Sequence, residues 1–345
     1  MARTHIWLLA LGGPEREEDL RPWLSAVLRD PSMMPVPMRM LTWIIVWMLL
    51  RARAPAYTPV HRQLSGGAPQ LQGVEHTARE LERLLGSRYR ATAVFRHHGA
   101  DLARAAAGVA PNDQVLLLPM HPQLHGGAVR AALYEAKASL QAKKAKVAQI
   151  ESWATHAPYV EALATAARRA LLDPTEGRAG LLILARGLPE AQAAAGDPYP
   201  KQAQATAAAL AAALGPTLPW RLAFAPVGFL ARPFRSHGPP IEAALEALAH
   251  RGVQRVIVVP IGAATDDLEG AWARQGPLRA AAAAAGLRLV MAESPASSAG
   301  FSRALIGLIH RAEREAGWPR PEDRYQDAIR AELAAQGARL LPEDR

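Results

Sequence analysis

Residues 181–202 read LLILARGLPEAQAAAGDPYPKQ, and this stretch decides how the fold is interpreted. The apolar run 181–185 is too short for a helix and soon meets glycine and proline, which is typical of a strand buried on both faces. A cation, Arg186, follows the run directly. Ligands of open α/β sheets bind just outside the carboxyl ends of strands. We therefore expect Arg186 to lie at a binding site.

The chain repeats this pattern. The segment LALGGPE (9–15) matches LARGLPE (184–190) at five of seven positions. Further along, QVLLLPMHPQ (114–123) resembles RVIVVPIGAA (255–264), so the order is the same in both halves. The first-half equivalent of Arg186 is Leu11, which means that the strand and turn do not themselves require a charge. Arg186 therefore needs a partner or an anionic ligand.

Eight strand-like runs alternate along the chain with Ala- and Leu-rich stretches of helical length. This alternation predicts βαβ units and parallel sheets. With the repeat, it predicts an α/β fold of two similar lobes, each with a parallel four-stranded sheet, and a ligand cleft between the lobes. We expect one lobe over 1–155, a second over 156–315, and a terminal helix or tail over 316–345. The expected strands are 5–11, 89–96, 113–120, 145–151, 180–185, 220–225, 254–261 and 287–292.

The first half carries an insertion. The matched motifs are 108 residues apart in the first half and 74 apart in the second. The difference is close to the length of segment 30–66, which we interpret as an apolar helical lip. Its apolar part, 38–50, is too short to span a bilayer, which takes about 20 apolar residues. It is either a core helix or a helix on a membrane surface, where Arg51 and Arg53 would meet the headgroups.

The composition of the 345-residue chain excludes several classes of site. It contains no cysteine, so disulfides, Cys-ligated zinc and iron–sulfur clusters are excluded. The formal net charge is +9, but no short run is rich in Lys and Arg, and we expect no nucleic acid partner. The first residues lack the pattern of a signal peptide, which predicts a cytoplasmic protein with at most peripheral membrane contact. No pattern in the sequence indicates an oligomeric state.

A second polar cluster, PIGAATDDLEGAWA (260–273), begins at the end of another buried strand. We expect Thr265 or Asp266 to cap the next helix, with Glu269 three residues after Asp266 as in a capping box. Helix capping is also an open role for Asp267. Glu269 would then lie in the first helical turn, where the helix dipole favours an anion. The alignment of the two halves puts it on the same rim as Arg186. Glu269 is therefore the carboxylate that we assign to the site.

Histidines form a third cluster. His97 and His98 follow one strand-like run of the first half, and His121 and His125 follow another. Both runs end at the carboxyl edge of the first predicted sheet. Such a cluster is compatible with metal binding, with hydrogen bonding to a ligand, or with no function. The spacing of the histidines does not decide among these alternatives.

Eight motifs follow one another along the chain: LALGGPE, DPSMMPVP, GGAPQ, FRHHG, LLLPMHPQ, ARGLP, GDPYPKQ and VVPIGAATDDLE. With these motifs in this order, the chain resembles the ferrochelatase family over residues 5–315. The resemblance implies two Rossmann-like lobes with a porphyrin cleft between them, and an apolar lip that covers the cleft and can touch a membrane. It implies insertion of Fe²⁺ into a porphyrin in haem biosynthesis, with porphyrin or haem as partner, Fe²⁺ as a substrate and no permanently bound cofactor.

The resemblance also implies a site. In the family a histidine before Gly-Leu-Pro faces a glutamate, and the pair takes pyrrole protons and handles the metal. Here Glu269 is retained, whereas Arg186 stands in place of the histidine. We take these two as the catalytic positions, and we expect Glu269, His97 and His121 as metal ligands. The expected substrate-binding residues are Leu11, Met33, Arg96, His97, His121, Gln123 and His125.

Arg186 changes what this site is expected to do. Arginine stays protonated and offers no lone pair, so it cannot accept a pyrrole proton, and its charge repels Fe²⁺. Three hypotheses remain. The chain is a ferrochelatase whose base has moved to one of the histidines, an impaired or repurposed relative that binds a tetrapyrrole, or a protein with no tetrapyrrole ligand. In the second hypothesis Arg186 pairs with Glu269 or with a propionate.

Overall fold

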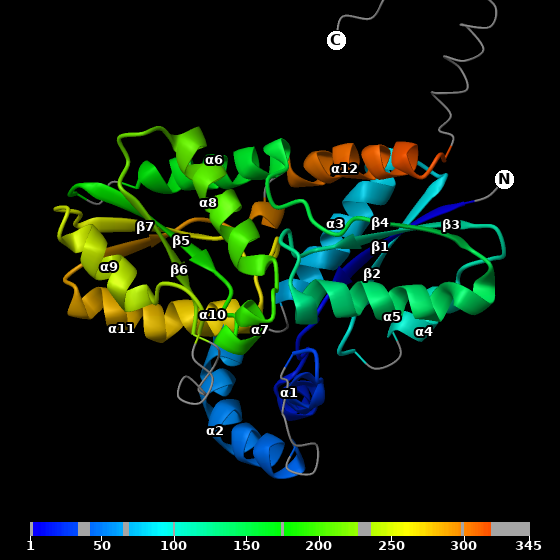
Figure 1. Cartoon of the computed structure of the whole chain (residues 1–345), viewed down its shortest axis with the longest axis horizontal. Coiled ribbons are helices and arrows are strands. Elements are labelled where there is room, and N and C mark those ends of the chain that lie inside the picture. The colour runs from blue at the N-terminus through cyan, green and yellow to red at the C-terminus, as the bar shows by residue number, and fades with distance from the viewer. Residues whose placement is uncertain are drawn as a thin grey trace, which may run out of the picture.

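The computed structural model describes residues 3–33, 42–64, 69–98, 101–173, 176–226, 236–297 and 300–318. Two α/β lobes lie side by side, and two helices project from between them (Figure 1). All eight predicted strands are present, and they form two four-stranded sheets in which every neighbouring pair is parallel. The α/β class and the two sheets predicted from the alternation of the sequence are therefore confirmed.

The first sheet has the order β2-β1-β3-β4. Its central strand is buried along its whole length, as its continuous apolar run predicts. Helices α3 and α12 pack on one face, and α4 and α5 pack on the other. The elements are β1 (Thr4–Ala10), η1 (Glu17–Asp19), α3 (Pro69–Leu85), β2 (Tyr89–Phe95), α4 (Asp101–Ala107), β3 (Gln114–Pro119), the π-helical turn η3 (Gly126–Arg130), α5 (Ala131–Leu140), η4 (Gln141–Lys143), β4 (Lys146–Gln149) and α12 (Phe301–Glu315).

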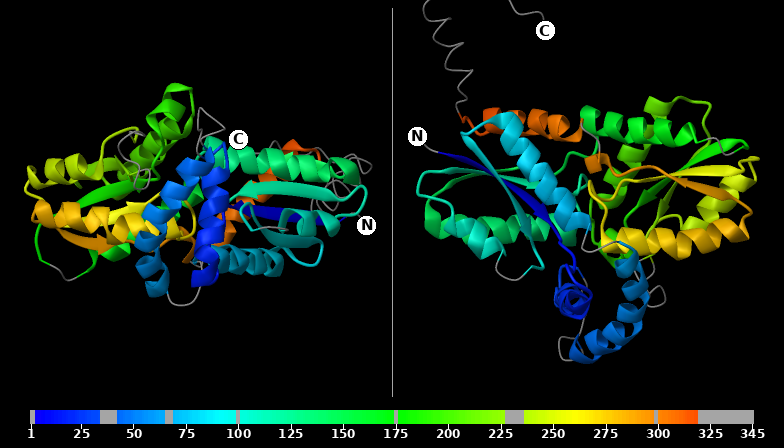
Figure 2. Two further views of the ribbon diagram at one scale, coloured as in Figure 1. Left: turned by 90° about the horizontal axis from the view of Figure 1, so that it is seen from below. Right: turned by 180° about the vertical axis from the view of Figure 1, so that it is seen from behind.

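The second sheet has the matching order β6-β5-β7-β8. Helices α6 and α8 cover one face and α9 and α11 cover the other. The core on the α6 and α8 side is continuous with the core of the first sheet, so the two lobes share buried apolar surface (Figure 2). The elements are α6 (Ala157–Leu171), β5 (Ala179–Ala185), α7 (Glu190–Ala194), α8 (Tyr199–Leu214), β6 (Trp220–Phe224), α9 (Ile241–Ala249), β7 (Arg255–Pro260), α10 (Leu268–Gln275), α11 (Pro277–Ala284), β8 (Arg288–Met291) and η5 (Pro295–Ser297).

Strand register shows that the sequence repeat is a structural repeat. In the first sheet Leu9 is the partner of Pro119, and in the second Leu184 is the partner of Pro260. These are the residues that the two sequence alignments match. The strands that end just before Leu11 and Arg186 therefore have equivalent neighbours in the two sheets, and these two residues occupy equivalent strand ends.

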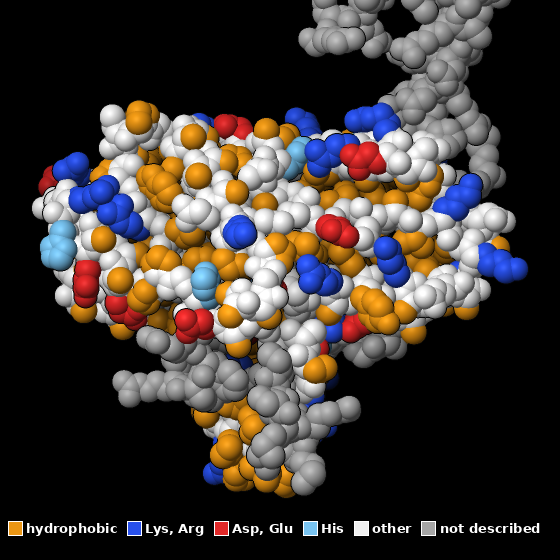
Figure 3. Space-filling view, viewed as in Figure 1, with side chains coloured by type: hydrophobic (Ala, Val, Ile, Leu, Met, Phe, Trp, Pro, Cys, Tyr) orange, Lys and Arg blue, Asp and Glu red, His pale blue; other side chains and the backbone are white. Residues whose placement is uncertain are grey.

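The lip contains α1 (Leu20–Arg29) and α2 (Thr42–Gln63), and residues 34–41 lie outside the described part. The core interpretation of its apolar part holds in part, whereas membrane contact stays a prediction, and Arg53, which it placed at the headgroups, is buried. Val46 and Leu49 are buried in a cluster that α1, α2 and α10 share. Trp43 and Trp47, by contrast, are 69% and 52% exposed, and hydrophobic side chains mark the projecting end (Figure 3). In the described part of the chain, no helix has the length and apolar character needed to cross a membrane.

Candidate functional site

A cleft opens at the carboxyl end of the second sheet, beneath the lip. Its volume is about 1240 Å³ when its open mouth is included. Its walls come from α1 and α2, from the ends of β5 and β7, and from the start of α10, and the first lobe contributes His125. Its lining includes Met33, Arg53, Tyr57, His125, Arg186, Asp267, Glu269 and Arg274. The cleft is thus the crevice outside the strand ends at which Arg186 was expected.

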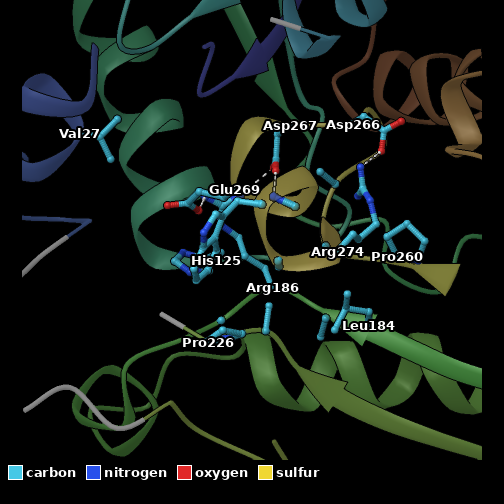
Figure 4. Close-up of a pocket in the computed structure, with 18 of the residues that line it drawn as sticks. Val27, His125, Leu184, Arg186, Pro226, Pro260, Asp266, Asp267, Glu269 and Arg274 are labelled. Atoms are coloured by element: carbon cyan, nitrogen blue, oxygen red, sulfur yellow. Dashed lines mark hydrogen bonds and ion pairs between the residues drawn. The ribbon is translucent and has the colours of Figure 1, made fainter. Parts of the chain in front are cut away.

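Arg186 is held on both its backbone and its side chain. Its N–H donates to the Tyr199 hydroxyl at 2.6 Å. Its Nη1 donates to Asp267 at 2.8 Å, and its Nη2 is paired with Glu269 (Figure 4). The Arg186 and Asp267 side chains are only 13% and 12% exposed, so this double ion pair is largely removed from water. The pairing with Glu269 considered from the sequence is formed, and it is shared with Asp267, which sequence reasoning did not assign to the site.

Asp267 lies at the start of α10, where it has a second role beside its ion pair with Arg186. Asp267, and not Thr265 or Asp266, is the N-cap of α10, since its carboxylate accepts from the Gly270 N–H at 2.6 Å. The capping box predicted at Asp266 is therefore wrong by one residue, whereas the capping role left open for Asp267 is confirmed. Asp266 is instead paired with Arg274 at 2.8 Å. Cap and first-turn carboxylates both face the positive end of the helix dipole, which stabilises their charged forms.

Electrostatics keep the central ion pair charged. Burial alone lowers the pKa of Arg186, but Glu269 and Asp267 outweigh that effect and the pKa lies above its ordinary value. Burial alone raises the pKa of Asp267, and here Arg186 outweighs it, so the pKa of Asp267 is lowered. Arg186 is thus a permanent cation with no lone pair. It cannot serve as a general base.

Two histidines of the first lobe lie near this pair. Burial, followed by the positive charge of Arg186, lowers the pKa of His121 to about 3 and that of His125 to about 4. His125 Nδ1 accepts hydrogen bonds from the Gly127 and Ala128 N–H groups, which fixes its neutral form and caps η3. His121 is 2% exposed, and neither ring nitrogen has a hydrogen-bond partner in the described structure. Both rings are therefore neutral at physiological pH.

Arg96 and His97 belong to a different buried cluster, at the start of the lip. Arg96 is paired with Asp30 and with Glu135, each at 2.6 Å, and it also donates to the Ser32 hydroxyl at 2.9 Å. His97 Nε2 lies 3.5 Å from the same Asp30 carboxylate, and burial lowers its pKa to about 4. The cluster ties the end of α1 to the first lobe. Its residues are not among those that line the cleft in the described part of the chain.

The other residues assigned from the sequence divide into those that line the cleft and those that do not. Met33 lines the cleft, together with His125, Arg186 and Glu269. Leu11, His121 and Gln123 are buried and do not line it, and Gln123 joins the lobes by donating to Thr206 of α8 at 3.0 Å. Of the cleft residues missed from the sequence, Asp267 had a usable signal, because it adjoins Glu269 on the same rim. Arg53, Tyr57 and Arg274 had none.

No group of three or more His, Asp or Glu side chains in the described residues is arranged to hold a metal ion. The expected metal ligands Glu269, His97 and His121 therefore do not form such a group. His97 instead faces Asp30 in the lip cluster, and Glu269 faces Arg186 in the cleft.

Comparison with known proteins agrees with this architecture. The ferrochelatase family model matches residues 3–313. A ferrochelatase of Synechococcus sp. (strain RCC307) is 31% identical over 288 residues, which is 78% of this chain and 72% of the relative. A ferrochelatase of Thermosynechococcus vestitus is 29% identical over 330 residues, or 90% of this chain and 82% of the relative.

A solved structure supports the fold independently of sequence. A multi-domain Deinococcus radiodurans protein, described as structurally similar to chelatases, matches with a TM-score of 0.52 at 13% identity. The match covers 91% of this chain and 55% of that protein, which is also described as having two additional domains. The family match over residues 3–313, the related ferrochelatases and the repeated parallel lobes lead to one conclusion: the chain belongs to the ferrochelatase family.

Proposed function

We propose that this ferrochelatase-family chain binds a porphyrin in the cleft and that Arg186 makes it a tetrapyrrole-binding relative in place of an ordinary metal-inserting enzyme. Family membership supports a tetrapyrrole as the ligand class. The cleft suits a large, mostly apolar ligand, because aliphatic and aromatic side chains from α1, α2 and α10 form much of its wall. A few polar groups at its floor would fix the orientation of the ligand.

The double ion pair of Arg186 with Asp267 and Glu269 is the observation that carries this proposal. Insertion requires two pyrrole protons to leave while a dication enters. The cleft carboxylates that could receive the dication already hold a guanidinium, which stays charged. A second cation beside it would be repelled in a site with little water. Binding of the porphyrin requires neither step.

A second candidate function is insertion of Fe²⁺ with a relocated base. The observation that favours it is His121, a neutral imidazole whose two nitrogens have no hydrogen-bond partner in the described structure. His121 or His125 would take the pyrrole proton, Glu269 would assist, and Fe²⁺ would be a substrate with no resident cofactor. A pKa of about 3 makes His121 a weak base near neutral pH, so the binding function is the better supported of the two.

We further propose that the lip touches a membrane at its periphery. Trp43, Ile44, Trp47 and Met48 of α2 are exposed, and the Arg51 guanidinium lies 5.3 Å from the ring centre of Trp47. Tryptophan and arginine together are suited to the interface between acyl chains and headgroups. An apolar porphyrin could then reach the cleft without crossing water. Flotation with anionic vesicles should recover the parent protein, and a Trp43→Ser/Trp47→Ser variant should stay at the bottom of the gradient.

The decisive experiment compares the parent with Arg186→His. Protoporphyrin is titrated into each by absorbance, and formation of the metalloporphyrin is then followed with Fe²⁺ or Zn²⁺. We expect both proteins to bind protoporphyrin and only Arg186→His to form the metalloporphyrin. Arg303→His, at an exposed position of α12, is the matched control and should behave as the parent.

Each other outcome decides against part of the proposal. Metal insertion by the parent would establish the second candidate function and make His121→Gln the next variant to assay. Failure of the parent to bind protoporphyrin would exclude both functions and leave a protein without a tetrapyrrole ligand.

A further inference from the structure

The edge of the second sheet opposite the cleft carries a concentration of arginines. In β7 and β8 the arginine is the first residue, in β6 it is the second, and β5 has one immediately before it. A fifth arginine lies in the turn before β7. Figure 3 shows Lys and Arg side chains gathered at the left edge of the molecule, over this lobe. The five residues are Arg178, Arg221, Arg251, Arg255 and Arg288.

These arginines are not neutralised as the cleft charges are. In the described structure none of the five forms an ion pair. Arg255 is buried and Arg221 half-buried, and the other three are exposed. Several donate to backbone carbonyl oxygens instead: Arg178 to Arg251 at 2.9 Å, Arg221 to Trp220 at 2.9 Å, and Arg288 to Glu176 at 2.7 Å. A carbonyl holds a guanidinium in place without cancelling its charge. The guanidinium groups are therefore pre-positioned and still positive.

Three of them share a groove. Arg178, Arg221 and Arg251 line a surface groove of about 1260 Å³, open to solvent, together with Gln204 and the half-buried Trp220. Its lining residues include no Asp or Glu. The like charges that line the groove repel one another, and a concave surface strengthens the resulting field. A bound anion would relieve the repulsion.

We propose that this groove binds a phosphate-bearing small molecule. A guanidinium can pair bidentately with a phosphate or a carboxylate, but a phosphate has three acceptor oxygens and more charge, so several guanidinium groups can share one phosphate. Gln204 adds an amide donor, and the Trp220 ring provides a surface on which a planar base can stack. The shared chemistry is a short chain of phosphates, which either an inorganic polyphosphate or a nucleotide could supply. The groove adjoins the amino ends of strands whose carboxyl ends form the cleft, so the proposal does not depend on porphyrin binding.

The test is calorimetric titration of the full chain with inorganic triphosphate and, separately, with ATP at constant ionic strength. We expect saturable binding, and we expect Arg178→Gln and Arg221→Gln each to weaken it about tenfold, the effect of losing one charge-assisted hydrogen bond. Arg303→Gln removes the same charge from an exposed site on α12 and should leave the affinity unchanged. If either groove variant melts at a lower temperature than the parent, Arg251→Gln replaces it as the groove variant.

The two anions distinguish the possible sources of phosphate. Equal affinities would assign recognition to the phosphates alone, whereas tighter binding of ATP would assign part of it to Trp220 and should disappear in Trp220→Leu. The proposal is overturned if neither anion binds, or if Arg303→Gln weakens binding as much as the groove variants. Protoporphyrin binding, measured on the same variants, should not change and so reports separately on the cleft.

Discussion

The carboxyl edges of the two lobes use the same backbone with opposite chemistry. In the first lobe the buried Leu11 follows β1, and the loop after β3 leads to the helical turn η3, which His125 caps. After β5 comes Arg186, and the loop of β7 leads to α10, capped by Asp267. A neutral imidazole thus caps one helical turn and a carboxylate caps the other. The residue at the equivalent strand end also differs: Leu11 of the first lobe is apolar, and Arg186 of the second is a cation.

This difference indicates that Arg186 is not an isolated substitution. The residue at the strand end and the residue that caps the helix differ together between the two lobes. Both His125 and Asp267 satisfy N–H groups that helix starts leave unpaired. Only the carboxylate brings a charge that must be balanced in a site with little water. The strand end of the second lobe supplies that balance.

The largest expected effect comes from acid, which would protonate the buried neutral histidines of the first lobe. His97, His121 and His125 have pKa values of about 4, 3 and 4, below the ordinary 6.5. The unfolded chain therefore binds protons as the pH falls through 6.5, whereas the folded chain does not until about 4. The stability that the three neutral rings contribute is fully present above pH 6.5. It is lost as the pH falls from 6.5 to about 4 for His97 and His125 and to about 3 for His121. At pH 5 the loss should be on the order of 5 kcal/mol in total.

Urea unfolding at pH 7.5 and pH 5.0 measures this effect. His97→Gln should shrink the difference between the two free energies of unfolding, and His76→Gln, at an exposed position of α3, should not. An unfolding free energy that is the same at both pH values would mean that the three rings are not held neutral in the fold.

The next effect comes from Arg186→Leu, which copies the first lobe into the second. It would leave Asp267 and Glu269 close together without their cation, and breaking a buried ion pair on one side destabilises by about 3–5 kcal/mol. Adding Asp267→Asn and Glu269→Gln should recover most of the loss, because asparagine caps a helix as well as aspartate does. Urea unfolding at pH 7.5 gives both values. A single variant as stable as the parent would show that the carboxylates do not require Arg186.

The fold was predictable because its signals are local and repeated. Strands buried on both faces are continuous apolar runs, and the match of 9–15 with 184–190 gave the lobes before any contact was known. Arg186 and Glu269 could be brought together because both follow strands that end at one edge. The helix start was missed by one residue, since Asp266 and Asp267 are equally good caps by sequence.

The rest depends on contacts that no local pattern encodes. Arg96 is paired with Asp30, which is 66 residues earlier and lies at the end of a lip helix. Knowing that His97 and His121 follow neighbouring strands gives their edge of the sheet, but not the direction of either ring. His97 turns to Asp30, and His121 is buried and does not line the cleft, so the expected metal-binding group does not form.

The smallest effect separates the glycines that follow the two strand ends. Gly12 has φ +85°, a left-handed conformation that costs alanine about 1–2 kcal/mol. Gly187 has no positive φ, but a Cβ there would run into the Ala225 carbonyl oxygen, and such overpacking costs about 1–3 kcal/mol. Asparagine tolerates the left-handed region, so Gly12→Asn should be milder than Gly12→Ala, whereas Gly187→Asn should be worse than Gly187→Ala. Thermal melts of the four variants test this reversal, and the same ranking at both positions would mean that the two turns need glycine for one shared reason.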